Sequence, residues 1–356
     1  MPALLDRADA FCRRFGLRVP ILQAPMAGAS PPELASAIAN AGGMGAVGAL
    51  LMDPAAISDW VAAFRTQSTG VFQVNLWIPE LAPVRDPDLE ARQRAFLAKW
   101  GPVVPAAAGD ATPADFSAQC EAVLAAKPSV VSSIMGLYPP AFVARLKEQG
   151  IAWFACVTTL AEALAAEAAG ADALVVQGAE AGGHRGSFNA DEAQRCAVGL
   201  VSLLPRLADR IQIPLIATGG IADGRGIAAA LVLGASAVQI GTGLLRSPQA
   251  GIHPAWAEAL ATTEPEDTIL TRAFSGRAGR AIARAYARAS MAADAPQPAP
   301  YPVQRGLSAL MRAEALKQGD IERMQAWAGQ SAAMARPLPA AQIVRQLWAE
   351  ARRILS

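Results

Sequence analysis

Only a few side chains in this sequence suit acid–base chemistry near neutral pH. The chain has 356 residues and two histidines. One of them, His184, directly follows Gly182 and Gly183, after an apolar run that ends at Gln177. Glycine lets a backbone approach a ligand closely, and an imidazole exchanges a proton at physiological pH. This setting favours a catalytic role for His184 over the alternative, a structural side chain held by hydrogen bonds.

The second histidine stands outside the glycine-rich motifs. His253 is followed by Pro254, a residue that often opens a helix, so we expect His253 to be a capping or surface residue. Two distant histidines and four scattered cysteines offer no metal-ligand spacing, so we expect no metal site.

Amide side chains and glycine turns recur where predicted strands end. Asn75 and Gln177 can donate and accept hydrogen bonds at once, which suits a heterocycle. The turns at 219–220 and 241–242 expose backbone N–H groups, which suit a phosphate. The alternatives are satisfied interior amides and simple tight turns. Together these residues predict a phosphorylated planar cofactor. FMN fits better than a dinucleotide, because no GxGxxG motif follows a strand and opens a helix.

An arginine-rich segment is a second candidate feature. Arg277, Arg280, Arg284 and Arg288 are spaced three or four apart, so they share one face if the segment is helical. No acidic residue lies between Arg272 and Arg288. The face could capture an anion, but we favour a solvated face paired with acids elsewhere, with Arg277 as the exception.

The elements that must position these residues follow one rhythm. Short apolar segments alternate with alanine-rich helical ones, and eight such segments predict a (β/α)8 barrel rather than an open sheet. The predicted strands are residues 21–24, 44–50, 72–76, 130–135, 153–157, 173–177, 214–217 and 237–241. The functional loops of such a barrel follow the C-terminal ends of the strands.

Two regions depart from the rhythm. Residues 79–127 carry scattered prolines and predict a helical insertion after the third strand. After Gly243 the pattern turns helical, and a proline-rich stretch at 295–302 separates the last helices. We therefore expect an FMN-binding barrel at 1–248 and a mostly helical region at 249–356 that packs on it as a lid.

Composition narrows the class of protein. With 53% hydrophobic and 17% charged residues, the chain can bury a sizeable core. The formal net charge of +1 gives no indication of nucleic-acid or anionic membrane partners. The N-terminus lacks a secretory signal, and the cysteines form no CxxC pair, so we expect a cytoplasmic protein with reduced thiols. A monomer or a homodimer is expected.

Eight motifs along most of the chain resemble those of the class I nitronate monooxygenases, also called the 2-nitropropane dioxygenase family. They are QAPMAG (23–28), NAGGMG (40–45), QVNLW (73–77), QGAEAGGHRG (177–186), TGGI (218–221), QIGT (239–242), FSGR (274–277) and WAGQ (327–330). The resemblance implies a TIM-barrel flavoprotein with noncovalent FMN and with His184 as its catalytic residue. The implied cofactor-binding residues are Pro25, Met26, Gly28, Asn75, Gln177, Gly182, Gly183, Gly219, Gly220, Gln239, Ile240, Gly241 and Thr242.

The resemblance also implies a reaction. Alkyl nitronates, with propionate 3-nitronate foremost, are oxidised with O2 to a carbonyl compound and nitrite through a flavin semiquinone, a route that detoxifies nitroalkanes. His184 would contact the nitro oxygens and act as a base if a neutral nitroalkane binds. Tyr138, Arg277 and Tyr301 are candidate substrate residues, although each tyrosine could equally be ordinary packing.

Two departures and one alternative accompany the resemblance. Residues 134–139 read IMGLYP where the family usually has an FG-x-P string, so the substrate wall there can differ. Residues 275–282 read SGRAGRAI, where relatives often have a proline after the arginine. Similar flavin motifs occur in NAD(P)H-dependent FMN reductases that act on a quinone or an enoyl thioester, and this activity is the alternative.

Overall fold

Eight parallel strands form a barrel in the computed structural model, which describes residues 2–356. Their order is β1-β9-β8-β6-β5-β4-β3-β2, and a parallel bridge between Leu22 and Met44 joins β1 to β2. The strands are β1 (Ile21–Gln23), β2 (Gly45–Gly48), β3 (Phe72–Trp77), β4 (Val130–Ile134), β5 (Ala152–Val157), β6 (Ala173–Gln177), β8 (Leu215–Thr218) and β9 (Ala237–Ile240). The predicted (β/α)8 barrel is confirmed, and each predicted strand segment overlaps one of these strands, with small shifts at the ends.

The strands are mostly apolar because both of their faces are buried. Leu22 and Phe154 belong to the side chains that fill the barrel interior. Phe11 and Phe15, from helix α1 (Pro2–Phe15), pack against Phe154 with ring centroids 6.2 and 4.9 Å from it. Helix α1 therefore closes one end of the interior and leaves the end where the strands finish for a site.

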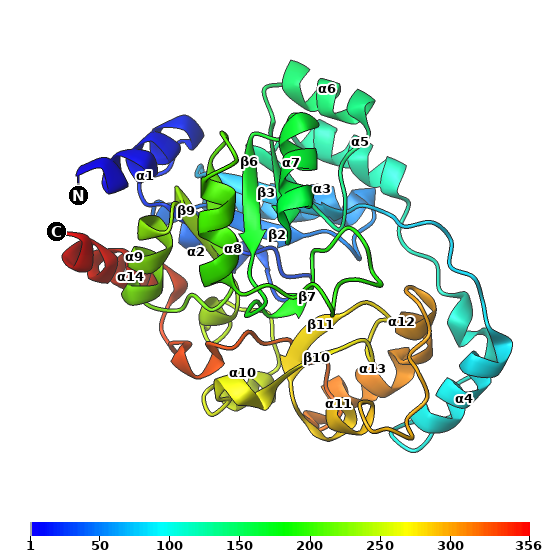
Figure 1. Ribbon diagram of the computed structural model, residues 1–356. Helices are drawn as coiled ribbons and strands as arrows, with labels where there is room; N and C mark the ends of the chain where they lie inside the picture. Colours follow the sequence, from blue (N-terminus) through cyan, green and yellow to red (C-terminus); the bar gives the residue numbers. More distant parts are fainter. Residues whose placement is uncertain (1) are drawn as a thin grey trace.

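A ring of helices covers the outer face of the barrel (Figure 1). They are α2 (Pro32–Asn40), α3 (Pro54–Gln67), α5 (Phe116–Ala126), α6 (Pro140–Glu148), α7 (Leu160–Ala168), α8 (Leu200–Ala208), α9 (Gly224–Val232) and α14 (Ala340–Leu355). Although α14 comes last in the chain, it packs against both α9 and α2, so the expected boundary at residue 248 does not separate the barrel from the rest. None of the helices within residues 2–356 is both long and apolar enough to cross a membrane.

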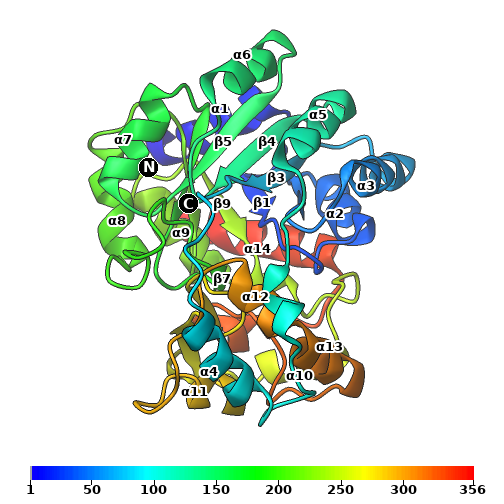
Figure 2. The same cartoon turned by 90° about the vertical axis from the view of Figure 1, so that its right-hand side faces the viewer.

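Two segments far apart in the sequence, residues 79–115 and 249–339, form a cap at the open end of the barrel; Figure 2 shows them grouped below it. The cap contains α4 (Pro87–Leu97), η1 (Ala106–Asp110), α10 (Pro254–Leu260), η3 (Pro265–Asp267), α11 (Ala285–Ala289), α12 (Val303–Leu307), α13 (Ala309–Gln318) and η4 (Ala332–Met334). α12 packs against α4 and η1, and a separate core that includes Phe274 and Tyr286 holds the cap together. The insertion was expected over 79–127, but α5 packs beside α3 and α6 and belongs to the helix ring.

A small antiparallel sheet connects the cap to the barrel. β10 (Thr268–Thr271) pairs with β11 (Gly279–Ile282), and β11 pairs with β7 (Gly183–His184) in the loop after β6. The expected helical arginine face does not exist, because Arg280 lies in β11 and helix α11 begins only after Arg284. Arg277, Arg280, Arg284 and Arg288 would share one face only in a continuous helix, and the strand pairing of β11 rules that helix out.

Candidate functional site

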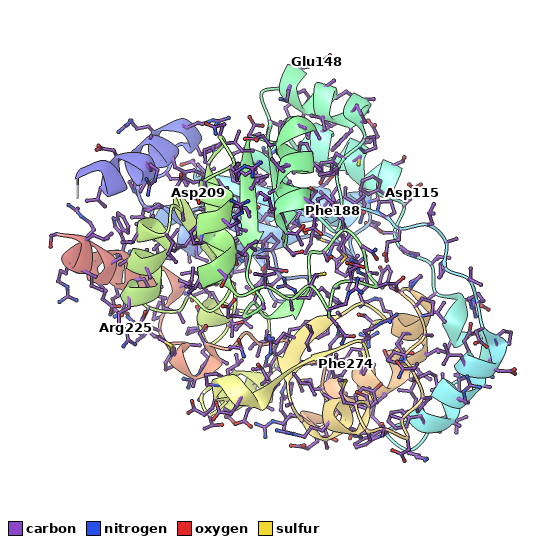
Figure 3. All side chains as sticks on the ribbon, viewed as in Figure 1. Asp115, Glu148, Phe188, Asp209, Arg225 and Phe274 are labelled. Carbon is purple, nitrogen blue, oxygen red and sulfur yellow. The ribbon has the colours of Figure 1, made fainter. Side chains whose placement is uncertain are left out.

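A cavity of about 290 Å³ lies at the C-terminal ends of the barrel strands. Its walls come from the ends of β1, β3, β6, β8 and β9, from the loop that contains β7, and from the cap. The arrowhead of β6 points toward β7 and the cap in Figure 1. Figure 3 shows side chains filling the space between the barrel, where Phe188 lies, and the cap, where Phe274 lies. The site is therefore formed jointly by the barrel and the cap.

The loop that carries His184 is held from two sides. Gln177 Nε2 donates to the His184 carbonyl at 3.0 Å, and Gln177 Oε1 accepts from Gly186 N at 2.8 Å. On the other side, β7 pairs with β11 so that His184 lies opposite Gly279. Both ends of the Gln177 amide thus position the loop. Gln177 therefore fits the alternative of a satisfied interior amide better than the prediction of an amide left free to bind a heterocycle.

The imidazole of His184 lies between two tryptophans. Its ring centroid is 4.8 Å from that of Trp77 and 4.8 Å from that of Trp327, both in edge-on arrangements. Its Nε2 atom is 2.7 Å from Ser275 Oγ. The buried Ser275 hydroxyl also lies 3.3 Å from the carbonyl oxygen of Arg277, to which it can donate. The hydroxyl can therefore donate either to His184 Nε2 or to Arg277, and so it supports either neutral tautomer of the imidazole.

Burial and nearby positive charge keep His184 uncharged. Burial, and then the guanidinium groups of Arg277, Arg305 and Arg312, lower the pKa of His184 from 6.5 to about 3. Both causes disfavour the imidazolium form. At neutral pH the ring therefore offers one N–H donor and one nitrogen acceptor to the site.

Free backbone donors gather at the ends of β8 and β9. Among residues 2–356, no protein group accepts a hydrogen bond from the N–H groups of Gly219, Gly220, Gly241 or Thr242, all of which line the cavity. Gly219 and Gly220 have φ angles of 111° and 70°, which glycine adopts readily. A Cβ at Gly219 would lie 3.0 Å from Ala181 N. This concave row of N–H groups fits a phosphate.

Two amides that line the cavity, those of Asn75 and Gln239, present complementary groups. Gln73 Nε2 donates to Gln239 Oε1 at 3.1 Å, which leaves the N–H groups of the Gln239 amide for the cavity. Asn75 Nδ2 donates to Ser132 Oγ at 3.1 Å, and no described residue bonds to Asn75 Oδ1. The N–H donors of Gln239 and the Oδ1 acceptor of Asn75 thus remain, as a flavin ring would require. The donor set and the backbone cradle both fit FMN.

Most of the expected cofactor residues line this cavity. They are Pro25, Met26, Asn75, Gln177, Gly182, Gly183, Gly219, Gly220, Gln239, Gly241 and Thr242. Two do not. Gly28 lies in an exposed turn with a φ of 79°, and Ile240 is 1% exposed in the core between the barrel and its helices. The side chain of Ile240 points away from the cavity because neighbouring strand residues alternate between the two faces.

The three candidate substrate residues have different surroundings. Tyr138 is buried against Phe116, Phe142 and Trp153 and donates to the Ser132 carbonyl at 2.9 Å, so it is a packing residue away from the cavity.

Arg277 does not line the cavity either. It is 2% exposed, with its guanidinium 2.6 Å from a Glu80 carboxylate oxygen. Tyr301 packs 5.4 Å from Trp77 and lines a second cavity of about 530 Å³ that shares Leu50 and Trp77 with the first.

Several residues that line the cavity were not predicted from the sequence. Arg305, Arg312 and Gln325 come from the cap, and only its docking brings them to the site. Trp77 and Trp327 stand within the QVNLW and WAGQ motifs, so their position in the motifs could have identified them. His253 caps α10 by accepting from Ala255 N at 3.1 Å, which confirms the expected capping role.

Comparisons with known proteins agree along nearly the whole chain. A family model described as nitronate monooxygenase matches residues 10–350. The chain is 38% identical to a nitronate monooxygenase of Paraburkholderia phytofirmans over 341 residues, which cover 94% of this chain and 93% of that protein. It is 38% identical to a nitronate monooxygenase of Pseudomonas aeruginosa over an alignment of 362 positions, which covers 97% of this chain and 99% of that protein.

Solved structures show the same relationship. A nitroalkane oxidase from Streptomyces ansochromogenes is 36% identical with a TM-score of 0.86, and the match covers 96% of this chain and 98% of that one. FabK from Thermotoga maritima is 28% identical with a TM-score of 0.76, and the match covers 97% and 96% of the two chains.

Proposed function

Because the chain belongs to the nitronate monooxygenase family of flavin-dependent oxidoreductases, we propose that it oxidises alkyl nitronates, with propionate 3-nitronate as its physiological substrate. FMN is the noncovalent cofactor, O2 is the co-substrate, and the products are a carbonyl compound and nitrite. One observation carries the proposal: a single cavity joins free backbone donors, a complementary amide pair and a neutral imidazole.

The residues that would hold FMN divide by the part of the cofactor they contact. The N–H groups of Gly219, Gly220, Gly241 and Thr242 would bind the phosphate. The Gln239 amide would donate to the flavin ring, and Asn75 Oδ1 would accept from it. When bound, FMN supplies the one-electron oxidation of the nitronate and the transfer of electrons to O2.

His184 acts on the substrate through its neutral ring. With Nε2 engaged by Ser275, Nδ1 is left to contact the nitro group. An N–H at Nδ1 donates to a nitronate oxygen, whereas a lone pair at Nδ1 can accept the α-proton of a neutral nitroalkane. A bound anion offsets the field of the nearby arginines and raises the pKa of His184. Trp77 and Trp327 exclude water from the two sides of the ring.

Acid lowers the stability of the protein through His184. The folded pKa of about 3 lies below the unfolded value of 6.5, so the unfolded state binds more protons between these values. The stabilising contribution is present above pH 6.5 and is lost as the pH falls toward 3. Between pH 7 and pH 5 we expect the free energy of unfolding to fall by about 1–2 kcal/mol more in the wild type than in His184→Asn. Denaturant titrations at the two pH values measure this, and equal losses would contradict a buried neutral imidazole.

The proposed function has a direct test. Purified flavin-loaded protein is mixed with propionate 3-nitronate in air, and nitrite release and O2 uptake are followed without NADH. We expect both, in proportion to the nitronate consumed. Absence of nitrite with this and with simple alkyl nitronates would reject the proposal.

The likeness to FabK favours a second candidate function, and the same purified protein can test it. A reductase of quinones or enoyl thioesters would show rapid anaerobic bleaching of the flavin by NAD(P)H. We expect no such bleaching, whereas anaerobic propionate 3-nitronate should change the flavin spectrum.

A further inference from the structure

The guanidinium of Arg305 faces the cavity without a partner. Arg305 lies in α12, lines the cavity, and is partly buried. Among residues 2–356, no carboxylate lies within 4.0 Å of its nitrogen atoms, and its side chain donates no hydrogen bond to a protein group. Burial lowers the pKa of Arg305, as expected for a charge removed from water without compensation. A charged group left in this state favours an anionic ligand.

Two other arginines of the cap, Arg277 and Arg280, are engaged by protein groups. Arg277 pairs with Glu80 at 2.6 Å, so this acid is already engaged. Arg280 donates to the Ala179 carbonyl and to Thr268 Oγ1, each at 3.0 Å. Arg305 differs from these two arginines, because its guanidinium has neither an ion pair nor a donated hydrogen bond to a described residue.

Arg312 holds the backbone of Arg305 in place. Arg312 Nη2 donates to the Arg305 carbonyl at 2.9 Å, while Nε and Nη1 donate to Ser308 Oγ and Gln325 Oε1, each at 3.0 Å. Ser308 in turn donates to the Phe274 carbonyl at 2.6 Å. The corner between α12 and α13 is thus rigid, and Arg312 adds a second positive charge with no acidic partner among the described residues.

Position in the cavity separates this pair from the phosphate cradle. The free N–H donors lie at the ends of β8 and β9, whereas Arg305 and Arg312 come from the cap. Arg305 follows Tyr301 by four residues, Tyr301 packs 5.4 Å from Trp77, and Trp77 lies 4.8 Å from His184. An anion at the arginines would accordingly lie near the imidazole, on the substrate side. His184 already contacts the nitro group in the proposed mechanism, which leaves Arg305 for a second negative group.

We propose that Arg305, supported by Arg312, binds a carboxylate that the substrate carries in addition to its nitronate group. A guanidinium fork matches a carboxylate with two parallel hydrogen bonds. The site thereby selects nitronates of short nitro-carboxylic acids over simple alkyl nitronates. This inference rests on the proposed function and assigns the substrate specificity of the site to Arg305.

A matched substrate pair tests the assignment, because propionate 3-nitronate and propyl-1-nitronate differ by a carboxylate in place of a methyl group. We expect Arg305→Met to lower kcat/KM for propionate 3-nitronate by about 10- to 100-fold, mainly through KM, with little change for propyl-1-nitronate. Arg305→Lys should recover part of the loss. Arg195→Met, which removes a 75% exposed side chain far in sequence from the cap, is the charge-matched control and should change neither substrate.

A binding measurement keeps the two proposals separate. Calorimetry on the flavin-loaded protein, in the absence of O2 so that neither ligand is turned over, gives the Kd of 3-nitropropionate and of 1-nitropropane. Arg305→Met should weaken only 3-nitropropionate, again by about 10- to 100-fold. If the wild type turns over no nitronate, the proposed function fails, and this calorimetric pair still decides the carboxylate site.

Three results would overturn the inference. Equal losses for both nitronates would place Arg305 on the nitronate group itself. Loss of FMN from Arg305→Met would place the guanidinium on the cofactor. Unchanged kinetics and unchanged Kd values in Arg305→Met would show that Arg305 has no role in substrate binding.

Discussion

The variant His184→Asn is expected to lower kcat/KM for a neutral nitroalkane by about 10²- to 10⁴-fold, the usual contribution of a positioned general base. For the corresponding nitronate we expect a loss of only about tenfold, since that substrate is already deprotonated and loses one hydrogen bond. The difference follows from the neutral state of His184 and from its contact with Ser275. Steady-state kinetics with nitroethane and ethyl nitronate measure both values.

The second histidine supplies the control. His253 caps α10 through its Nδ1 atom, and asparagine is a good N-cap residue, so His253→Asn should leave both activities unchanged. If His184→Asn retained FMN and full activity with both substrates, the histidine would have no part in the mechanism. An equal loss with the two substrates would instead point to a binding role without proton transfer.

The variant Gly182→Ala is expected to weaken FMN binding by about 10- to 100-fold. A Cβ at this position would lie 2.4 Å from Gly329 N and 2.6 Å from Ala328 C, which are backbone atoms that cannot rotate away. Overpacking of this kind costs about 1–3 kcal/mol, and the strain falls on the cavity wall that would contact the cofactor. Flavin content after purification and the Kd for FMN measure the effect.

The neighbouring glycine is the matched control. Gly183 has a φ of 74°, and a Cβ at this position would meet no atom within 4 Å. The variant Gly183→Ala therefore meets backbone strain of about 1–2 kcal/mol but no clash. We expect it to lower stability in a thermal melt while retaining most of its FMN. Loss of FMN in Gly183→Ala alone would show that loop conformation, and not the contact with the 327–330 segment, controls cofactor binding.

Local sequence patterns were sufficient for the barrel and for most of its cavity wall. Buried parallel strands must be apolar on both faces, so each strand could be recognised from its own residues. Their C-terminal ends converge in any such barrel, so the strand pattern alone was enough to place the turns at 219–220 and 241–242 together. The face on which a strand-end residue points was harder to assign, and the side chain of Ile240, expected at the cofactor, lies in the core between the barrel and its helices.

Helix assignments in the irregular regions were less successful for a specific reason. Spacing of three or four would give an arginine face only if the segment were helical, but pairing with β7 and β10 holds Arg280 in a strand. Likewise, α14 fills the last place in the helix ring although the whole second cap segment separates it from β9. Tertiary contacts overrode local periodicity in one case and sequence order in the other.

The sequence by itself determined the barrel, the glycine turns that would hold a phosphate, and His184 as the residue suited to chemistry. Only the tertiary structure decided the surroundings of that histidine. Ser275 reaches it because β7 and β11 pair although they lie far apart in the sequence, and Arg305 faces the same cavity because α12 docks beside it. The physical reason is that a strand or a turn is encoded by neighbouring residues, whereas the charge and partners of a buried side chain depend on which distant segments pack around it.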